Sequence, residues 1–110
     1  MLKRLITTLL ILTIATIALA PAAFAADTDG AALFELHCAG CHINGGNIVR
    51  RGKTLKLKAL QRNGYDSQEA VETIVTHGKN NMSAFADRLT PEQIAAVSAY
   101  VLDQAQNDWK

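Results

Sequence analysis

The residues best suited to chemistry lie in one short stretch, ELHCAGCHINGG, at residues 35–46. Cys38 and Cys41 are the two cysteines of the chain, and His42 follows the second one directly. Two thiols at this spacing can form a disulfide, bind a metal ion, act as a redox dithiol or anchor a larger group. The imidazole beside them is a further metal ligand. Other features of the sequence distinguish among these four interpretations.

Three of the interpretations fit the sequence poorly. A thioredoxin-like dithiol needs a βαβ unit around it, and no alternating strand pattern is evident. A zinc site with ligands Cys38, Cys41 and His42 would be strained, because Cys41 and His42 are adjacent, and a second ligand pair is missing unless His37 or His77 helps. A disulfide across so short a loop would stabilise the fold little.

The spacing C-x-x-C-H is instead the sign of covalent haem c attachment. Two thiols on one turn of helix can form thioethers with the two vinyl groups of a porphyrin, and the next imidazole then lies under the iron. We therefore predict one covalent haem c with its iron, anchored by Cys38 and Cys41. His42 is the predicted proximal iron ligand.

The sixth position of the iron has four candidate states: Met82, His77, His37 or an open site. His37 is tied to the proximal side through Cys38, and His77 precedes Gly78 at a helix end, where a polar surface side chain is favoured. Met82 lies in the polar loop GKNNMSAFADR, which is not a core helix. We predict Met82 as the distal ligand. A filled sixth site favours electron transfer over enzyme chemistry, with a haem-based redox sensor as the alternative.

Short helices must position these residues. Capping residues, glycines and apolar spacing predict helices from Gly30 toward Cys38, Leu55–Gln61, Asp66 or Ser67 to Gly78, and Thr90 to about Ala105. Residues 43–54 and 79–89 are predicted loops, and their length next to the reactive residues favours a binding role. We expect an all-α, single-domain fold.

The N-terminus has the features of a secretory signal peptide. Lys3 and Arg4 precede an uncharged apolar run, and Ala23-Phe24-Ala25 is a typical cleavage site. The apolar run is shorter than a membrane-spanning helix, so we expect no stable membrane insertion after processing. The predicted division is a signal peptide at 1–25 and an exported domain at 26–110.

Charge is unevenly distributed along the predicted mature domain. Removal of Lys3 and Arg4 leaves nine basic against ten acidic residues, which argues against a nucleic-acid partner. Most basic residues fall in one acid-free stretch: Arg50, Arg51, Lys53, Lys56, Lys58 and Arg62. Such a surface can steer a protein partner, although a solvated basic helix face is an equally simple interpretation.

Several segments resemble the class I c-type cytochromes, and among them the cytochrome c6 family of cyanobacteria and algae. The likeness spans the predicted mature chain: CAGCH, GGN with Val49, KTL at Lys53–Leu55, HGKNNM at 77–82, and FADRLTPEQIAAVSAYV at 85–101. The first motif is specific only for haem c. The last two segments make the resemblance to cytochrome c6 specific.

The resemblance implies about four short helices wrapped around one covalently attached haem. The first and last helices would cross, with Gly30 and Phe34 packed against Tyr100. It also implies a soluble, monomeric electron carrier in the thylakoid lumen or periplasm. Its donor would be the cytochrome b6f complex, and its acceptor photosystem I or a terminal oxidase. Arg88 matches a docking arginine of the family; its alternative role is an ordinary exposed loop charge.

Two positions depart from the family pattern. Ser83 stands where a proline normally follows the methionine, which predicts a less rigid ligand loop. Ile74 stands where members carry a glutamine near the haem, which is similar to cytochrome c6-like side branches. This second departure raises the alternative of a carrier of lower potential that serves another acceptor, such as a terminal oxidase.

Overall fold

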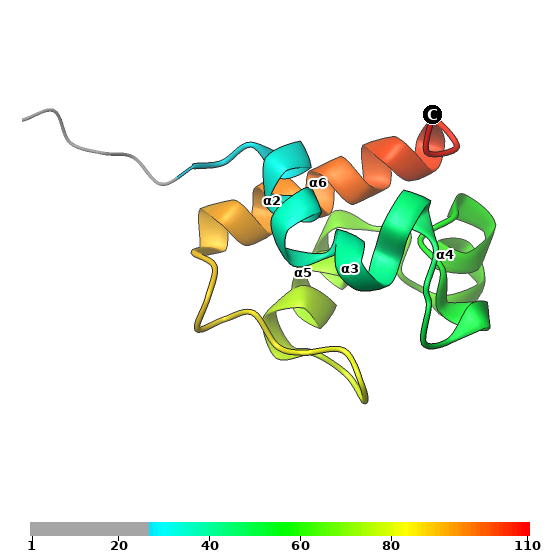
Figure 1. Ribbon diagram of the computed structural model, residues 1–110, viewed down its shortest axis with the longest axis horizontal. Coiled ribbons are helices and arrows are strands. Elements are labelled where there is room, and N and C mark those ends of the chain that lie inside the picture. The colour runs from blue at the N-terminus through cyan, green and yellow to red at the C-terminus, as the bar shows by residue number, and fades with distance from the viewer. Residues whose placement is uncertain (1–26) are drawn as a thin grey trace, which may run out of the picture.

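The computed structural model describes residues 27–110, so the predicted signal peptide lies outside the described residues. The described part is helical, as predicted, and its only β-type pairing is an isolated bridge between Lys79 and Met82. The helices, labelled in Figure 1, are α2 (Gly30–His37), α3 (Ala39–His42), α4 (Leu57–Asn63), α5 (Gln68–His77) and α6 (Pro91–Gln106), and two 3-10 turns are η1 (Ile43–Gly45) and η2 (Arg51–Lys53).

Local capping signals account for where the two longest helices begin. Thr90 and Gln93 form a reciprocal capping box: the Thr90 hydroxyl accepts from the Gln93 amide at 3.2 Å, and the Gln93 side chain accepts from the Thr90 amide at 2.9 Å. Pro91 occupies the first turn of α6, where its missing N–H costs nothing. Of the two predicted caps of α5, Ser67 is the one used, accepting from the Ala70 amide.

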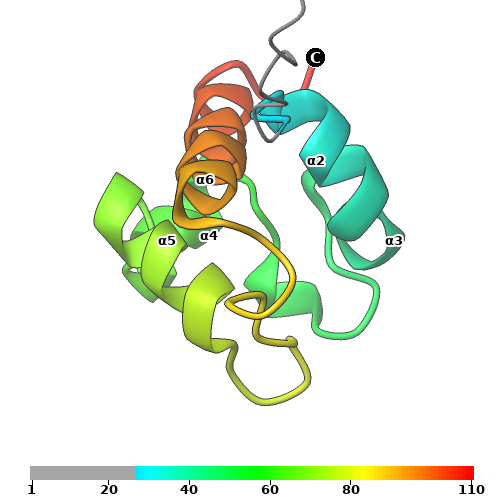
Figure 2. The ribbon, with the colours of Figure 1, turned by 90° about the vertical axis from the view of Figure 1, so that its left-hand side faces the viewer.

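Helices α2 and α6 cross closely, as the family resemblance implies. A Cβ on Gly30 would lie 2.5 Å from the Ala96 carbonyl oxygen, so only glycine permits this approach. The rings of Phe34 and Tyr100 pack beside the crossing with centroids 5.4 Å apart. Figure 2 shows α2 and α3 on one side and α5 on the other, with the loop after α5 running below them.

The region between α3 and α5 differs from the prediction. The predicted loop at 43–54 contains the turns η1 and η2, and the predicted helix Leu55–Gln61 is α4, Leu57–Asn63. Leu55 is held outside the helix because its amide donates to the Gly45 carbonyl at 2.7 Å. Gly64, with φ of 79°, ends α4 in the left-handed region as the Asn63-Gly64 pair predicts.

One hydrophobic core joins α2, α5, α6 and the loop before α6. Its buried members are Leu33, Phe34, Val71, Val75, Phe85, Leu89, Ile94, Val97 and Val101. Cys38, at the end of α2, and Met82, in the loop after α5, are both half-buried and pack against this core. The core therefore supports both halves of the predicted site.

Candidate functional site

A single helical turn holds the two cysteines and the histidine. Cys38 ends α2 and begins α3, and its carbonyl accepts from the amides of Cys41 and His42 at 3.1 and 2.9 Å. Both thiols are free, Cys38 half-buried and Cys41 exposed. Burial raises the pKa of the Cys38 thiol to about 11, because desolvation disfavours the thiolate. The pair is thus presented as two separate thiols on one turn.

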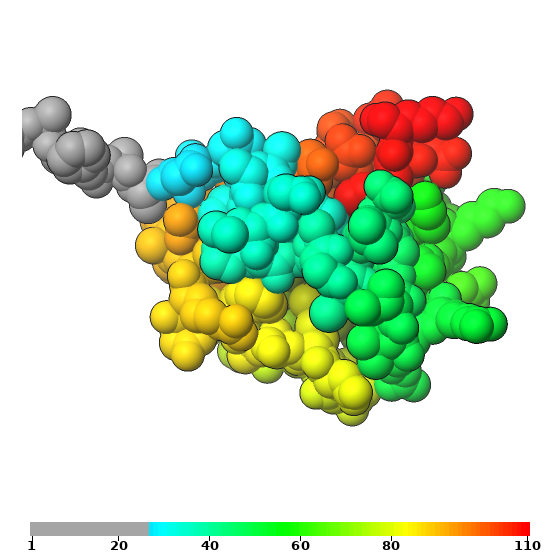
Figure 3. All heavy atoms as spheres, in the orientation of Figure 1, coloured from blue at the N-terminus to red at the C-terminus, as the bar shows by residue number. Residues whose placement is uncertain are grey.

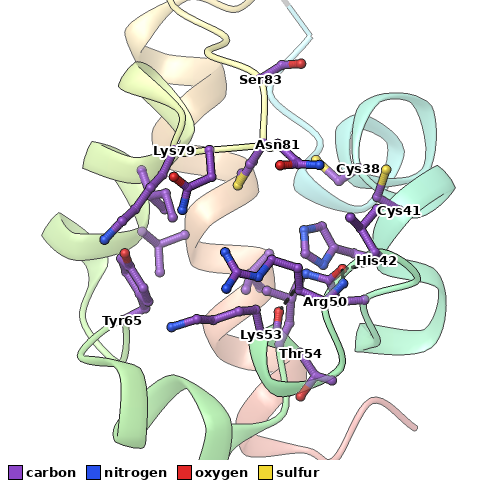
Figure 4. A pocket seen from close by; sticks show the side chains of 18 of the residues that line it. Cys38, Cys41, His42, Arg50, Lys53, Thr54, Tyr65, Lys79, Asn81 and Ser83 are labelled. Carbon is purple, nitrogen blue, oxygen red and sulfur yellow. Dashed lines mark hydrogen bonds between the residues drawn. The ribbon is translucent and has the colours of Figure 1, made fainter.

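The imidazole of His42 has a defined orientation. Its Nδ1 lies 2.8 Å from the carbonyl oxygen of Gly46. A carbonyl only accepts, so Nδ1 carries the proton and Nε2 keeps its lone pair for a metal. Figure 4 shows the ring of His42 pointing into a cavity. Its geometry matches that of a metal-ligating histidine fixed by a backbone carbonyl.

The turn that supplies the Gly46 carbonyl is braced by the C-terminus. Asn44 and Gly45 both have positive φ, 53° and 75°, so the chain reverses sharply after α3. A Cβ on Gly45 would lie 2.5 Å from the indole of Trp109. The Trp109 Nε1 donates to the Leu55 carbonyl at 2.9 Å and closes this contact. These positioning residues were not predicted.

Met82 is held by a short hairpin-like loop after α5. The amide of Lys79 donates to the Met82 carbonyl at 3.0 Å, and the amide of Met82 donates back at 2.9 Å. Gly78 permits the approach, since a Cβ there would lie 2.6 Å from the Met82 carbonyl oxygen. The amide of Phe85 donates to the Val75 carbonyl and ties the loop to α5. These backbone bonds hold the loop together, with Ser83 at the position where the resemblance implies a proline.

The four predicted site residues line one cavity of about 520 Å³: Cys38, Cys41, His42 and Met82. This volume suits a cofactor-sized ligand. Apolar side chains form much of the wall, including Leu55, Leu60, Val71, Ile74, Phe85 and Val101. Four cationic side chains also line it: Arg50, Lys53, Lys79 and Arg88. No aspartate or glutamate is among its described lining residues. An apolar wall with a cationic rim fits a porphyrin, whose faces are apolar and whose two propionates are anionic.

The alternative ligands lie elsewhere or on the proximal side. His77 is exposed at the end of α5 and lines a separate depression with Tyr65 and Ile74. His37 does line the main cavity, but it belongs to α2 beside Cys38 and packs edge-on against Phe85 with centroids 6.2 Å apart. Within residues 27–110, no cluster of three or more histidine, cysteine or acidic side chains forms a metal site.

Known proteins resemble the chain over most of its length. Residues 25–101 match the family model "Cytochrome C oxidase, cbb3-type, subunit III". The chain is 57% identical over 93 residues to a cytochrome c6-like protein of Nostoc sp. (strain PCC 7120), covering 84% of each chain. It is 51% identical over 108 residues to cytochrome c6 of Thermosynechococcus vestitus, covering 97% of this chain and 96% of the relative. The crystal structure of cytochrome c6C from Synechococcus sp. PCC 7002 is 63% identical with a TM-score of 0.72, covering 76% of this chain and 100% of that chain.

The chain belongs to the cytochrome c6 family. Its fold is therefore that of a class I cytochrome c, and it carries one covalent haem c with an iron centre. As a cytochrome c6 family member it is an electron carrier and not an enzyme. None of the helices described between residues 27 and 110 is long and apolar enough to cross a bilayer.

Proposed function

We propose that Cys38 and Cys41 attach the haem through thioethers, and that His42 and Met82 ligate its iron from opposite faces. The observation that carries this proposal is the shared cavity, in which a free imidazole Nε2 and a thioether come from separate segments of the chain. Histidine–methionine ligation is typical of cytochromes c and raises the reduction potential. When bound, the haem supplies a one-electron couple at its iron.

The task of the chain is then to keep the two ligands still. The Gly46 carbonyl fixes the tautomer and direction of His42, and the paired backbone bonds between Lys79 and Met82 fix the distal loop. Apolar side chains on the cavity wall lower the polarity around the site. Fixed ligands limit the rearrangement that accompanies a change of redox state.

The proposed working form is residues 26–110, a monomer released from the signal peptide in the thylakoid lumen or periplasm. We assign the cytochrome b6f complex as its electron donor and photosystem I as its acceptor, with a terminal oxidase as a second acceptor. The similarity to cytochromes c6 along almost the whole chain supports this role over a lower-potential carrier or a haem-based sensor.

Arg88 is the side chain we assign to docking with photosystem I. It is exposed and borders the cavity, and its guanidinium lies 4.4 Å above the ring of Phe85. The Nε of Arg88 lies 4.0 Å from a carboxylate oxygen of the neighbouring Asp87. Because Asp87 is itself exposed, this ion pair leaves Arg88 accessible to solvent. A cation fixed over an aromatic ring at the cavity rim can contact an acidic partner.

The test is electron transfer with isolated complexes. The mature holoprotein should be reduced by the cytochrome b6f complex and should re-reduce photo-oxidised photosystem I at a rate that rises with its concentration. Arg88→Ala should slow the second reaction several-fold, whereas Lys110→Ala, which removes the same charge at the C-terminus, should not. A protein that cycles reversibly by one electron but reacts with neither complex would refute these partners.

A further inference from the structure

The acid-free segment at 50–62 forms a basic face beside the cavity. Its six basic side chains are all exposed to solvent: Arg50, Arg51, Lys53, Lys56, Lys58 and Arg62. In the space-filling view of Figure 3, this segment, coloured green, occupies one end of the molecule, and several of its side chains extend outward. We call these six residues the basic face.

Hydrogen bonds connect this face rigidly to the cavity. The Asn47 carboxamide oxygen accepts from the amides of Val49 and Arg50 at 2.9 and 2.8 Å, and its nitrogen donates to the Lys53 carbonyl at 3.0 Å. Asn63 accepts from the Lys53 ammonium at 2.9 Å and donates to the Gly52 carbonyl at 3.1 Å. The side chains of Asn47 and Asn63 are uncharged, so they hold the segment in position without cancelling the charge of its basic residues.

No ion pair with a carboxylate balances the charge of the basic face among the described residues. Within residues 27–110 the ion pair formed is that of Arg88 with Asp87, and none of the six basic residues takes part in it. The acids nearest in sequence are Glu35 before the segment and Asp66 after it. The domain is thus strongly polarised although its net charge is close to zero.

Exposed apolar side chains adjoin the basic face at the cavity. Ile48 is 68% exposed and Val49 is 53% exposed, and Val49 lines the cavity together with Arg50 and Lys53. An apolar contact area bordered by unpaired charge suits a small, transient interface, in which charge sets orientation and association rate more than affinity.

From these observations we propose that the basic face is a docking surface for a redox protein whose own contact face carries clustered carboxylates. The proposal rests on the electron-carrier function proposed above and adds the site and charge of the partner. Docking there would bring the partner to the cavity edge at Val49. One electron then passes between the two redox centres, and no bond forms or breaks and no proton moves.

The sign of the salt dependence distinguishes local charge from net charge. The predicted mature chain has nine basic against ten acidic residues, so its net charge alone would repel anions slightly. The basic face would attract them, and salt would screen that attraction over about 10 Å at 0.1 M. An anionic and a cationic electron acceptor of small size should therefore respond to salt in opposite directions.

The experiment uses the reduced mature holoprotein with hexacyanoferrate(III) and with tris(phenanthroline)cobalt(III). From low to high ionic strength, the rate of oxidation by the anion should fall several-fold, and the rate with the cation should rise. The triple variant Arg51→Gln, Lys56→Gln, Lys58→Gln should weaken or reverse both trends. None of these three side chains lines the cavity.

A matched control changes the net charge equally on another face. Ala31→Glu, Ala99→Glu, Gln106→Glu adds three negative charges at exposed positions of α2 and α6, none of which lines the cavity. This control should keep the trends of the parent protein. Equal effects of the two triple variants, or parent rates that follow net charge, would overturn the docking proposal and leave the carrier function intact. A holoprotein that neither reagent oxidises would overturn both.

A second measurement locates the contact directly. Polyglutamate added to the reduced holoprotein should shift backbone amide resonances of residues 48–62 and leave those of α6 unchanged. Shifts confined to residues 79–88 would show that acidic partners dock at the opposite rim of the cavity, and would refute the proposal.

Discussion

The Nδ1 of His42 lies 2.8 Å from the carbonyl oxygen of Gly46, four residues further along the chain. This contact makes the side chain most relevant to the iron depend on the backbone of the turn η1. The turn depends in turn on Gly45, whose φ of 75° favours glycine and whose α-carbon is covered by Trp109. The orientation of His42 therefore depends, through Gly45, on the packing of Trp109 near the C-terminus.

The first prediction concerns this turn. Gly45→Ala should lower the free energy of unfolding by about 2 kcal/mol or more, because it adds a strained positive φ and a clash with the Trp109 indole. Denaturant titration of the holoprotein measures the change. Gly52→Ala is the matched control: it meets no heavy atom within 4 Å and should stay within about 0.5 kcal/mol of the parent. Equal stability of the two variants would contradict this account.

The second prediction concerns the bond from Trp109 to Leu55. Trp109→Phe keeps an aromatic ring against Phe34 and Gly45 but removes the Nε1 donor, leaving the Leu55 carbonyl without this partner. We expect a loss of about 1 kcal/mol in denaturant titrations. An unchanged midpoint would mean that the indole N–H adds nothing to the brace.

Local signals in the sequence predicted several features of the fold correctly. The capping box at Thr90, the left-handed Gly64 and the end of α5 before Gly78 each depend on residues within one helical turn, so a sequence pattern reveals them. The position of α4 was wrong by two residues at each end. The backbone of Leu55 forms hydrogen bonds with the Gly45 carbonyl and the Trp109 side chain, which lie elsewhere in the sequence. Helical periodicity cannot predict such contacts.

The site shows the same division. Cys38, Cys41 and His42 form a contiguous motif, so their common position could be read from the sequence. Met82 could be named because it is the methionine that remains after removal of the predicted signal peptide and because it lies in a polar loop with glycine and asparagine. The roles of the Gly46 carbonyl and of Trp109 could not be predicted. The first is a backbone atom, and the second acts across 54 residues of sequence separation.

The third prediction separates the two thioethers. Exported Cys38→Ala or Cys41→Ala should each retain haem through one thioether, and haem should still co-migrate with the chain in a denaturing gel. The variant lacking both thiols should lose all haem in denaturant, because no covalent bond then remains. Retention of haem by the double variant would contradict attachment through these two cysteines.

The fourth prediction concerns Ile74, which lines the cavity and is half-buried. Ile74→Gln should raise the midpoint potential, because an amide donor near the haem withdraws electron density and favours the reduced iron. Equilibrium redox titration measures the shift. Ile74→Leu, which keeps an apolar side chain of the same size, should leave the potential close to that of the parent. Equal potentials for the two variants would mean that this position does not tune the iron.

The central claim is that iron is held between His42 and Met82, and proton NMR of the reduced mature holoprotein tests it most directly. A methyl group placed over the porphyrin gives a three-proton signal far upfield of all others. We expect this signal in the parent protein and in His77→Ala, and its loss in Met82→Ala together with tighter binding of added imidazole. A parent spectrum without the signal, or a signal that survives in Met82→Ala, would contradict the account.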